Sequence, residues 1–99
     1  MARVTIAREE LATFCRRHHI CRLALFGSVL RDDFGPDSDI DVLVEFAPGA
    51  RVGLIKMSGI EEELSLLFGR KVDLRTAADL SRYFRDQVVE AAEVQYAEG

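Results

Sequence analysis

The chain has 99 residues, of which 48% are hydrophobic and 30% are charged. This length and composition predict one globular domain over residues 1–99. The 13 Lys and Arg residues against 17 Asp and Glu give a net charge of −4, which argues against direct binding to long nucleic acids, because proteins that bind them usually carry a basic surface. No secretion leader and no apolar run of membrane-spanning length is found, so we predict a cytoplasmic protein without a membrane partner.

The first half of the chain predicts one helix and two strands. Apolar residues at three- and four-residue spacing predict a helix over residues 6–18, with Thr5 as its N-terminal cap. Residues 22–26 are predicted to form a buried strand, followed by Gly27-Ser28 and a short helical turn through Arg31. Turn-forming residues predict a loop over residues 32–38, and a second strand follows over residues 40–46. The inner stripe of the helix is expected to contain Leu11, Phe14, Cys15 and His18.

The second half predicts two helices and one strand. Amphipathic spacing predicts a helix over about residues 52–68 that ends at Gly69. Its buried face is expected to contain Met57, Ile60, Leu64, Leu67 and Phe68. A short strand is predicted over residues 71–75. From about residue 77 we expect helix, with Leu80, Phe84, Val88 and Ala92 packed inward. The resulting order αβαβαβα predicts helices on one face of the sheet and carboxylates on the other.

Asp39 and Asp41 are the first candidate site. Side chains two residues apart on a strand point to the same face, so the two carboxylates are expected to lie side by side. A turn explains Asp39 easily, but Asp is depleted within strands, which makes Asp41 harder to explain structurally. Oxygen ligands of this kind suit Mg²⁺ or Mn²⁺. The pair therefore predicts a metal site.

Two further features are expected to lie near this pair. Gly27-Ser28 follows a strand at a predicted helix start, a position that suits a phosphate group, although such a dipeptide is more often a simple turn. Asp73 lies between apolar residues in a short strand. It is either an edge-strand charge or a third carboxylate. If its strand is a neighbour of the one with Asp41, the three carboxylates would lie on one face and hold two metal ions.

Together these residues resemble a known family. Gly27-Ser28 followed after ten residues by Asp39-Ile40-Asp41, within GSVLRDDFGPDSDIDVLVEF, is similar to the signature of the minimal nucleotidyltransferases of the DNA polymerase β-like superfamily. The resemblance extends from about residue 21 to residue 96, with Asp73 at the place of the family's third carboxylate. Asp32 differs from the glycine of many relatives.

The resemblance implies an α/β fold with a small mixed sheet, helices on one face and the active site on the other. It implies that Asp39, Asp41 and Asp73 are catalytic and bind two Mg²⁺ ions, with Mn²⁺ as an alternative. It also implies AMP transfer from ATP, or another NTP, to a side chain of a small helical HEPN-type partner, with this chain as the antitoxin. Gly27, Ser28, Arg31 and Ser38 are assigned to nucleotide binding.

Several alternatives remain open. The chain could be an antitoxin that neutralises a helical partner by contact alone, and a homo-oligomer is an alternative to a helical partner. Arg31 could contact phosphate or pair with Asp33 or Asp37. A dehalogenase-like phosphatase is disfavoured, because its paired carboxylates follow the apolar run instead of beginning it. Cys15, His18, His19 and Cys21 have a zinc-like spacing but are interpreted as core cysteines and partly buried histidines, because a tetrahedral site needs all four to converge.

Overall fold

The computed structural model describes residues 6–31 and 34–98, so the predicted cap Thr5 and the loop residues Asp32 and Asp33 lie outside the described residues. Its helices and strands follow in the order α1 (Arg8–Arg17), β1 (Ile20–Phe26), η1 (Gly27–Leu30), β2 (Ile40–Phe46), α2 (Leu54–Phe68), β3 (Val72–Arg75), η2 (Ala77–Asp79), α3 (Arg85–Ala91) and β4 (Glu93–Ala97), where η denotes a 3₁₀ helix. No helix within the described ranges is long and apolar enough to cross a membrane.

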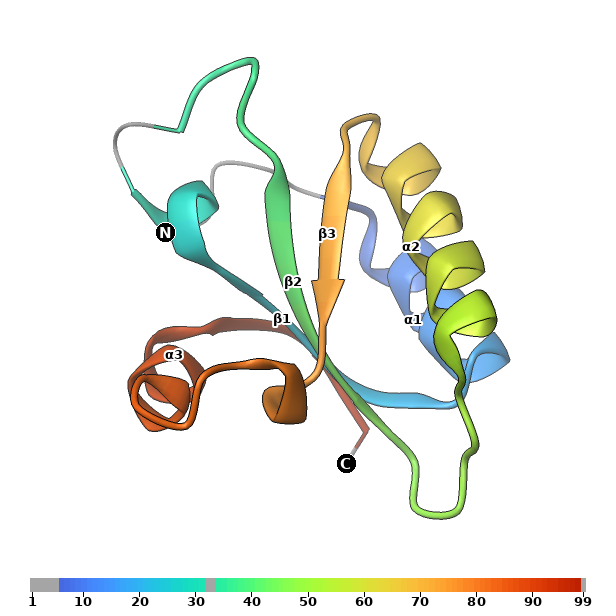
Figure 1. Ribbon diagram of the computed structural model, residues 1–99. Coiled ribbons are helices and arrows are strands. Elements are labelled where there is room, and N and C mark those ends of the chain that lie inside the picture. The colour runs from blue at the N-terminus through green and yellow to red at the C-terminus, as the bar shows by residue number, and fades with distance from the viewer. Residues whose placement is uncertain (1–5, 32–33, 99) are drawn as a thin grey trace.

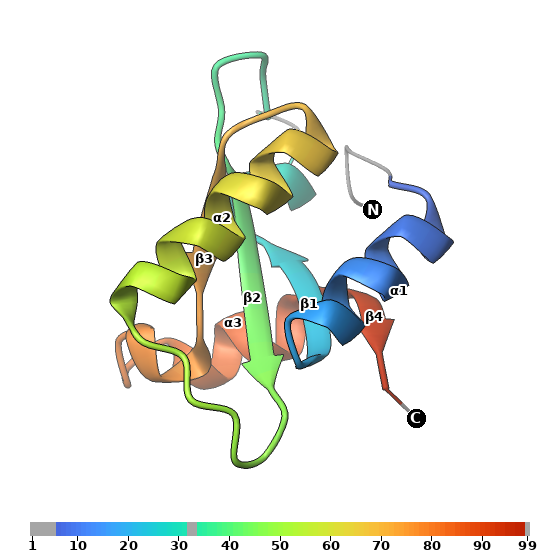
Figure 2. The same cartoon turned by 90° about the vertical axis from the view of Figure 1, so that its right-hand side faces the viewer.

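The four strands form one mixed sheet in the order β3-β2-β1-β4. β1 pairs antiparallel with both β2 and β4, whereas β2 and β3 are parallel. Helices α1 and α2 cover one face of the sheet (Figures 1 and 2). Helix α3 lies on the opposite face, so the predicted separation of helices and carboxylates holds for α1 and α2 but not for the C-terminal part of the chain (Figure 1).

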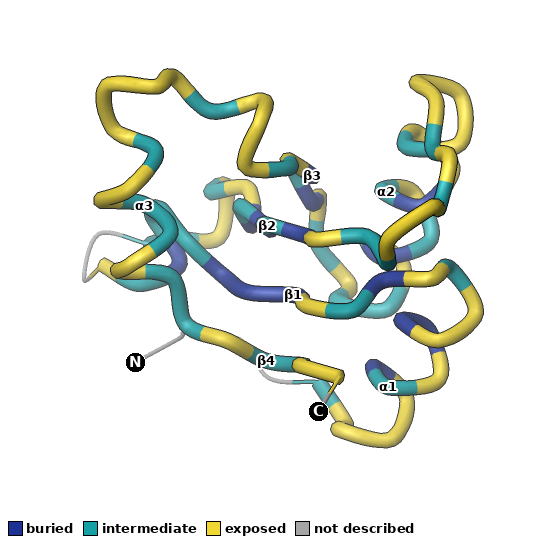
Figure 3. The backbone as a smooth tube through the Cα atoms, turned by 90° about the horizontal axis from the view of Figure 1, so that it is seen from below, coloured by how far each residue is buried: buried dark blue, intermediate teal, exposed yellow. Residues whose placement is uncertain are grey.

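The core lies between the sheet and helices α1 and α2, where the buried stretches of the tube in Figure 3 face one another. Alternation along β2 places Ile40, Val42 and Val44 in this core, as their spacing predicts. On the helices, Leu11, Phe14 and Cys15 of α1 and Ile60 and Leu64 of α2 are buried, while the other predicted inward residues of α2 are partly buried. The predicted helix stop is confirmed, because Gly69 adopts a left-handed conformation with φ of 70°.

The C-terminal part differs from the helix predicted after residue 77. It begins with a 3₁₀ turn, continues as a seven-residue helix and ends as strand β4 beside β1. None of Leu80, Phe84, Val88 and Ala92 is fully buried, and Phe84 is 57% exposed. The four-residue spacing of these side chains is therefore not a core pattern. Backbone pairing with the open edge of β1 prevails over the local helical periodicity of the final residues.

Candidate active site

Asp41 and Asp73 occupy paired positions on adjacent strands. The parallel register of β2 and β3 places Asp41 opposite Asp73 and Ile40 opposite Val72. Both aspartates are half-buried, and their neighbours along each strand, such as Val42 and Val72, are buried on the other face. The expectation that these strands are neighbours is confirmed. The two carboxylates therefore project from the sheet face that lies opposite α1 and α2.

Gly27 provides the space that the Asp41 carboxylate occupies. Its φ of 73° is in the left-handed region, and a Cβ atom placed on it would lie 2.2 Å from Asp41 Oδ2. A side chain at this position is therefore excluded both by its backbone conformation and by the carboxylate. The backbone N–H of Ser28 donates a hydrogen bond to the Asp41 carboxylate, and this bond ties the start of η1 to β2.

The surroundings of Asp41 disfavour its negative charge. Burial raises the pKa of Asp41, and the negative charges of Asp73 and Asp39 raise it further. The hydrogen bond from the Ser28 N–H and the positive charge of Arg75 have the opposite effect and lower the pKa of Asp41. The carboxylates are thus close enough to affect one another electrostatically, and a bound cation would reverse the repulsion among them.

The other two carboxylates contact basic side chains. Lys71 Nζ lies 3.8 Å from Asp39 Oδ2, and Arg75 Nη2 lies 3.2 Å from Asp73 Oδ2. Among the residues that the structure describes, no three Asp, Glu, His or Cys side chains converge closely enough to hold a metal ion. The sequence interpretation overlooked Lys71 and Arg75, although strand alternation puts both on the same face as Asp73.

The residues assigned to nucleotide binding lie in three different places. Gly27 and Ser28 lie beside Asp41, and Ser28 Oγ donates to the backbone oxygen of Asp39 over 3.4 Å. Ser38 is instead part of the preceding loop, where its hydroxyl accepts a hydrogen bond from the Gly35 N–H over 3.1 Å. The exposed Arg31 follows η1, and its backbone N–H donates to Ser28 O over 2.9 Å. Gly27 and Ser28 are thus the two of these four residues that the described contacts place beside Asp41.

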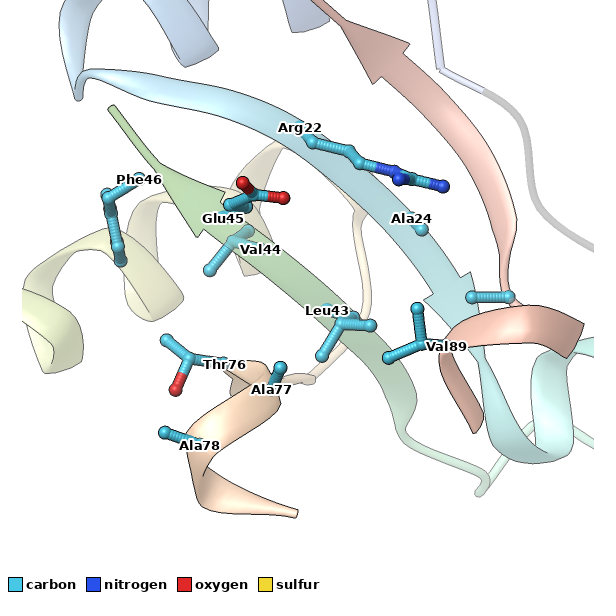
Figure 4. Close-up of a pocket in the computed structure, with 11 residues that line it drawn as sticks. Arg22, Ala24, Leu43, Val44, Glu45, Phe46, Thr76, Ala77, Ala78 and Val89 are labelled. Atoms are coloured by element: carbon cyan, nitrogen blue, oxygen red, sulfur yellow. The ribbon is translucent and has the colours of Figure 1, made fainter. Parts of the chain in front are cut away.

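A cavity of about 300 Å³ lies further along the same sheet face, beneath α3 and η2 (Figure 4). Leu43, two residues after Asp41, faces this cavity, and its register partner Ala24 lines it from β1. Ala77 and Ala78 of η2 and Val89 of α3 close it from the other side. The cavity thus lies on the same sheet face as the aspartates, but Asp39, Asp41 and Asp73 do not line it.

The zinc-like cluster of the sequence is dispersed in the structure. Cys15 of α1 is fully buried in the hydrophobic core, and burial raises the pKa of its thiol to about 12. His18 Nε2 lies 2.9 Å from Glu63 Oε2 of helix α2. Within residues 6–31 and 34–98 no metal-binding group of three such side chains is found. Cys15 is thus a core residue, and His18 links the end of α1 to α2.

Comparison with known proteins gives the family. Residues 8–94 match the family described as nucleotidyltransferase domain. A Methanocaldococcus jannaschii protein, named provisionally as a protein adenylyltransferase, is 32% identical over 85 residues, which cover 86% of this chain and 89% of that protein. The protein adenylyltransferase MntA of Thermococcus cleftensis is 38% identical over 71 residues, which cover 72% of this chain and 67% of that protein.

Solved structures agree with this result. A structure described as a minimal nucleotidyltransferase has a TM-score of 0.70 and 35% identity, and the match covers 86% of this chain and 85% of that one. The MNT antitoxin in complex with a tri-AMPylated HEPN toxin of Shewanella oneidensis has the same fold, with a TM-score of 0.65, 21% identity and coverage of 91% of this chain and 69% of that one. With its mixed sheet and paired aspartates, this chain belongs to the nucleotidyltransferase domain family and is an enzyme of the minimal nucleotidyltransferase type.

Proposed function

We propose that this protein transfers AMP from ATP to a side-chain hydroxyl of a partner protein. The observation that carries the proposal is the register of Asp41 and Asp73, which places two carboxylates together beside Gly27 and Ser28. Two relatives that match most of the chain are named as protein adenylyltransferases, one of them provisionally, which supports AMP as the transferred group and a protein as the acceptor.

Enzymes of this family generally use divalent metal ions, and the donor chemistry here suits such ions once the three aspartate side chains turn toward one another. Asp39, Asp41 and Asp73 offer hard carboxylate oxygens, and the pKa of Asp41 is raised in part by its acidic neighbours. We propose that these three aspartates hold two Mg²⁺ ions, with Mn²⁺ as an alternative, after exchanging their contacts with Lys71 and Arg75. When bound, the ions would neutralise phosphate charge and favour ionisation of the acceptor hydroxyl.

The proposed reaction is a single displacement. The acceptor oxygen forms a bond to the α-phosphorus of ATP, the bond from that phosphorus to the bridging oxygen of the β-phosphate breaks, and pyrophosphate leaves. Asp73 lies on the exposed face of β3 and would accept the proton of the hydroxyl. The Ser28 hydroxyl and the Arg31 side chain would contact the phosphates. Gly27 and the Ser28 N–H would serve the site indirectly, because Gly27 makes room for the Asp41 carboxylate and the N–H donates to it.

We further propose that the protein acts as the antitoxin of a small helical HEPN-type toxin. The similar fold of an MNT antitoxin bound to an AMPylated HEPN toxin supports this partner. The name of the Thermococcus cleftensis relative supports the same kind of chemistry. Transfer of AMP to such a toxin would inactivate it by covalent modification.

The test is label transfer from α-³²P-ATP to a small helical HEPN-type protein supplied as the acceptor. Wild-type protein with Mg²⁺ is expected to label the partner, and the double variant Asp39→Ala/Asp41→Ala is expected to label it at least about 100-fold less. Both proteins are first compared by circular dichroism to show that they fold. Absence of labelling by the folded wild type, with either Mg²⁺ or Mn²⁺, would overturn the proposal.

A non-catalytic antitoxin is the second candidate. The contacts of Lys71 with Asp39 and of Arg75 with Asp73 favour it, because these carboxylates are already paired within the chain. A growth assay in cells that express the toxin distinguishes the two functions. If wild type and the double aspartate variant protect cells equally and neither labels the toxin, neutralisation is by contact.

A further inference from the structure

We infer that Arg70 is a positioning residue for Asp39, an inference that rests on the proposed function. Arg70 lies between Gly69, which ends α2, and Lys71, which precedes β3. It is separated by more than 30 residues from the loop over residues 34–38, yet it holds that loop by three contacts. The structure therefore joins the start of β3 to the segment that presents Asp39.

The guanidinium of Arg70 binds the loop from one side. Arg70 Nη2 donates hydrogen bonds to the backbone oxygens of Gly35 and of Ser38, the latter over 2.8 Å. The same group stacks over Phe34, with Cζ lying 4.2 Å from the ring centroid. Two carbonyl groups and one aromatic ring are thus fixed by a single planar cation.

The loop is also closed on itself. Gly35 N donates to Ser38 Oγ over 3.1 Å, and Ser38 N donates to Gly35 O over 3.1 Å. Ser38, a predicted nucleotide ligand, thus has a structural role in this loop. The two carbonyls that Arg70 binds stand at the two ends of this small ring, so Arg70 fixes the ring as a unit.

The backbone on each side of Asp39 is hydrogen-bonded to the segment Arg70-Lys71. The carbonyl of Ser38, directly before it, accepts from Arg70 Nη2. The N–H of Ile40, directly after it, donates to Lys71 O over 2.9 Å. Since the backbone is fixed on both sides of Asp39, the direction of its carboxylate depends on Arg70 and Lys71. The Asp39 side chain itself is 46% exposed and has little packing to hold it.

The side-chain chemistry distinguishes Arg70 from a lysine. A lysine ammonium could donate to both carbonyls, as the single Nη2 atom does, but it could not also place a flat face over Phe34. We therefore expect Arg70→Lys to recover only part of the function lost in Arg70→Gln. Arg17→Gln is the matched control. Like Arg70, Arg17 has a polar contact, here an ion pair with Glu63 of α2, and lies over an aromatic ring, that of Phe14 at 6.0 Å, but it is far in sequence from the loop over residues 34–38.

The first measurement is amide hydrogen exchange of the peptide that contains residues 34–41, in the full chain without ligand. We expect Arg70→Gln to speed exchange in this peptide about tenfold or more, while Arg17→Gln leaves it unchanged. The second is the midpoint of Mn²⁺ binding in the presence of ATP, followed by electron paramagnetic resonance. Here we expect Arg70→Gln to weaken binding about 10- to 100-fold, as is typical when the support of a metal ligand is lost.

A double-mutant cycle separates positioning from general destabilisation. If Arg70 acts through Asp39, Arg70→Gln will have little further effect on Mn²⁺ binding in an Asp39→Asn background, whereas independent effects would add. Additive losses, or a wild-type midpoint in folded Arg70→Gln, would overturn the inference on Arg70 alone. If the wild type itself shows no metal-dependent ATP binding and no transfer, the proposed function fails, and the positioning role fails with it. Loop exchange would then report only a structural contact.

Discussion

Gly27 and Asp41 constrain each other at the scale of single residues. The left-handed conformation of Gly27 brings its Cα so close to the Asp41 carboxylate that no Cβ atom fits between them. The same turn presents the Ser28 N–H to that carboxylate. The sequence showed Gly27 and Asp41 as parts of one motif, but their contact could not be predicted from spacing, because it depends on the pairing of Phe26 with Asp41 across β1 and β2.

Gly27→Ala is therefore expected to damage both stability and activity. The added methyl group must displace the Asp41 carboxylate, and the left-handed backbone by itself costs about 1–2 kcal/mol in a residue with a side chain. We expect a lower free energy of unfolding in urea and a loss of nucleotide transfer of at least about 100-fold, because small displacements of reacting groups have effects of that size.

Gly49→Ala is the control for the backbone contribution. Gly49 has a similar φ of 85°, but apart from Gly49 and its two chain neighbours no heavy atom of the described residues lies within 4 Å of the position of its Cβ. We expect this variant to lose about 1–2 kcal/mol of stability and to retain wild-type transfer. Equal transfer by the two variants would show that the space beside Asp41 is not needed for function.

At the scale of elements, helix α2 supports the edge strand that carries Asp73. The N–H groups of Val72 and Leu74 donate to Ser65 Oγ over 2.9 Å and to Glu61 Oε2 over 2.7 Å. Two side chains of α2 thus replace the missing neighbouring strand on both sides of Asp73. This arrangement protects the edge of the sheet and fixes the strand that presents the carboxylate.

Glu61→Ala should loosen β3. Loss of the acceptor leaves the Leu74 N–H without its partner, at an expected cost of about 1–3 kcal/mol in the free energy of unfolding. Glu61→Gln keeps an acceptor oxygen and should cost less. Urea unfolding of the two variants checks this prediction, and equal destabilisation would show that the Leu74 hydrogen bond is not the source of the effect.

The sequence predicted elements well where one pattern dominated. Strand β2 was predicted with its observed bounds, because the apolar run from Ile40 is bounded by the turn formers before it and by Pro48-Gly49 after it. Helix α2 was predicted through its final residue, because Gly69 gives a clear stop. The last segment was mispredicted, because whether EVQYA forms a strand depends on a free edge of β1, which no local pattern reveals.

The presence of β4 as a packed strand can be tested directly. Tyr96 pairs with Leu23 of β1 and packs against the core, although it is only partly buried. We expect Tyr96→Ala to lower the free energy of unfolding by about 1–3 kcal/mol. Tyr83→Ala removes the same side chain at a position that is 76% exposed, and it should change stability by less than about 0.5 kcal/mol. Comparable losses in both variants would argue against a packed β4.

For the whole molecule, the buried Cys15 predicts a loss of stability at alkaline pH. Burial raises the pKa of the thiol from 9.0 to about 12 in the folded chain. Above pH 9 the unfolded chain therefore loses the Cys15 proton while the folded chain keeps it. The unfolded chain then binds fewer protons, so stability falls as pH rises, by up to about 1.4 kcal/mol per pH unit.

Urea unfolding of wild type and Cys15→Ala between pH 8 and pH 11 isolates this contribution. The cavity left by Cys15→Ala lowers stability at every pH, but the stability difference between the two proteins should shrink as pH rises above 9. Cys21→Ala serves as the comparison, because Cys21 is only partly buried. A stability difference for Cys15→Ala that stays constant over this range would contradict the prediction.

The parallel register of β2 and β3 makes the position of Asp73 depend on the length of one connection, the segment between α2 and β3. Gly69, Arg70 and Lys71 join α2 to β3, and side chains alternate between faces along the strand that follows. If an insertion of one residue there shifted β3 along β2 by one residue, Asp73 would turn toward the apolar interior and Val72 toward solvent. Such a change in length would lower the stability of the fold, because a carboxylate without a partner is costly to bury in an apolar core. Selection for folding therefore preserves the length of this connection, independently of selection for catalysis.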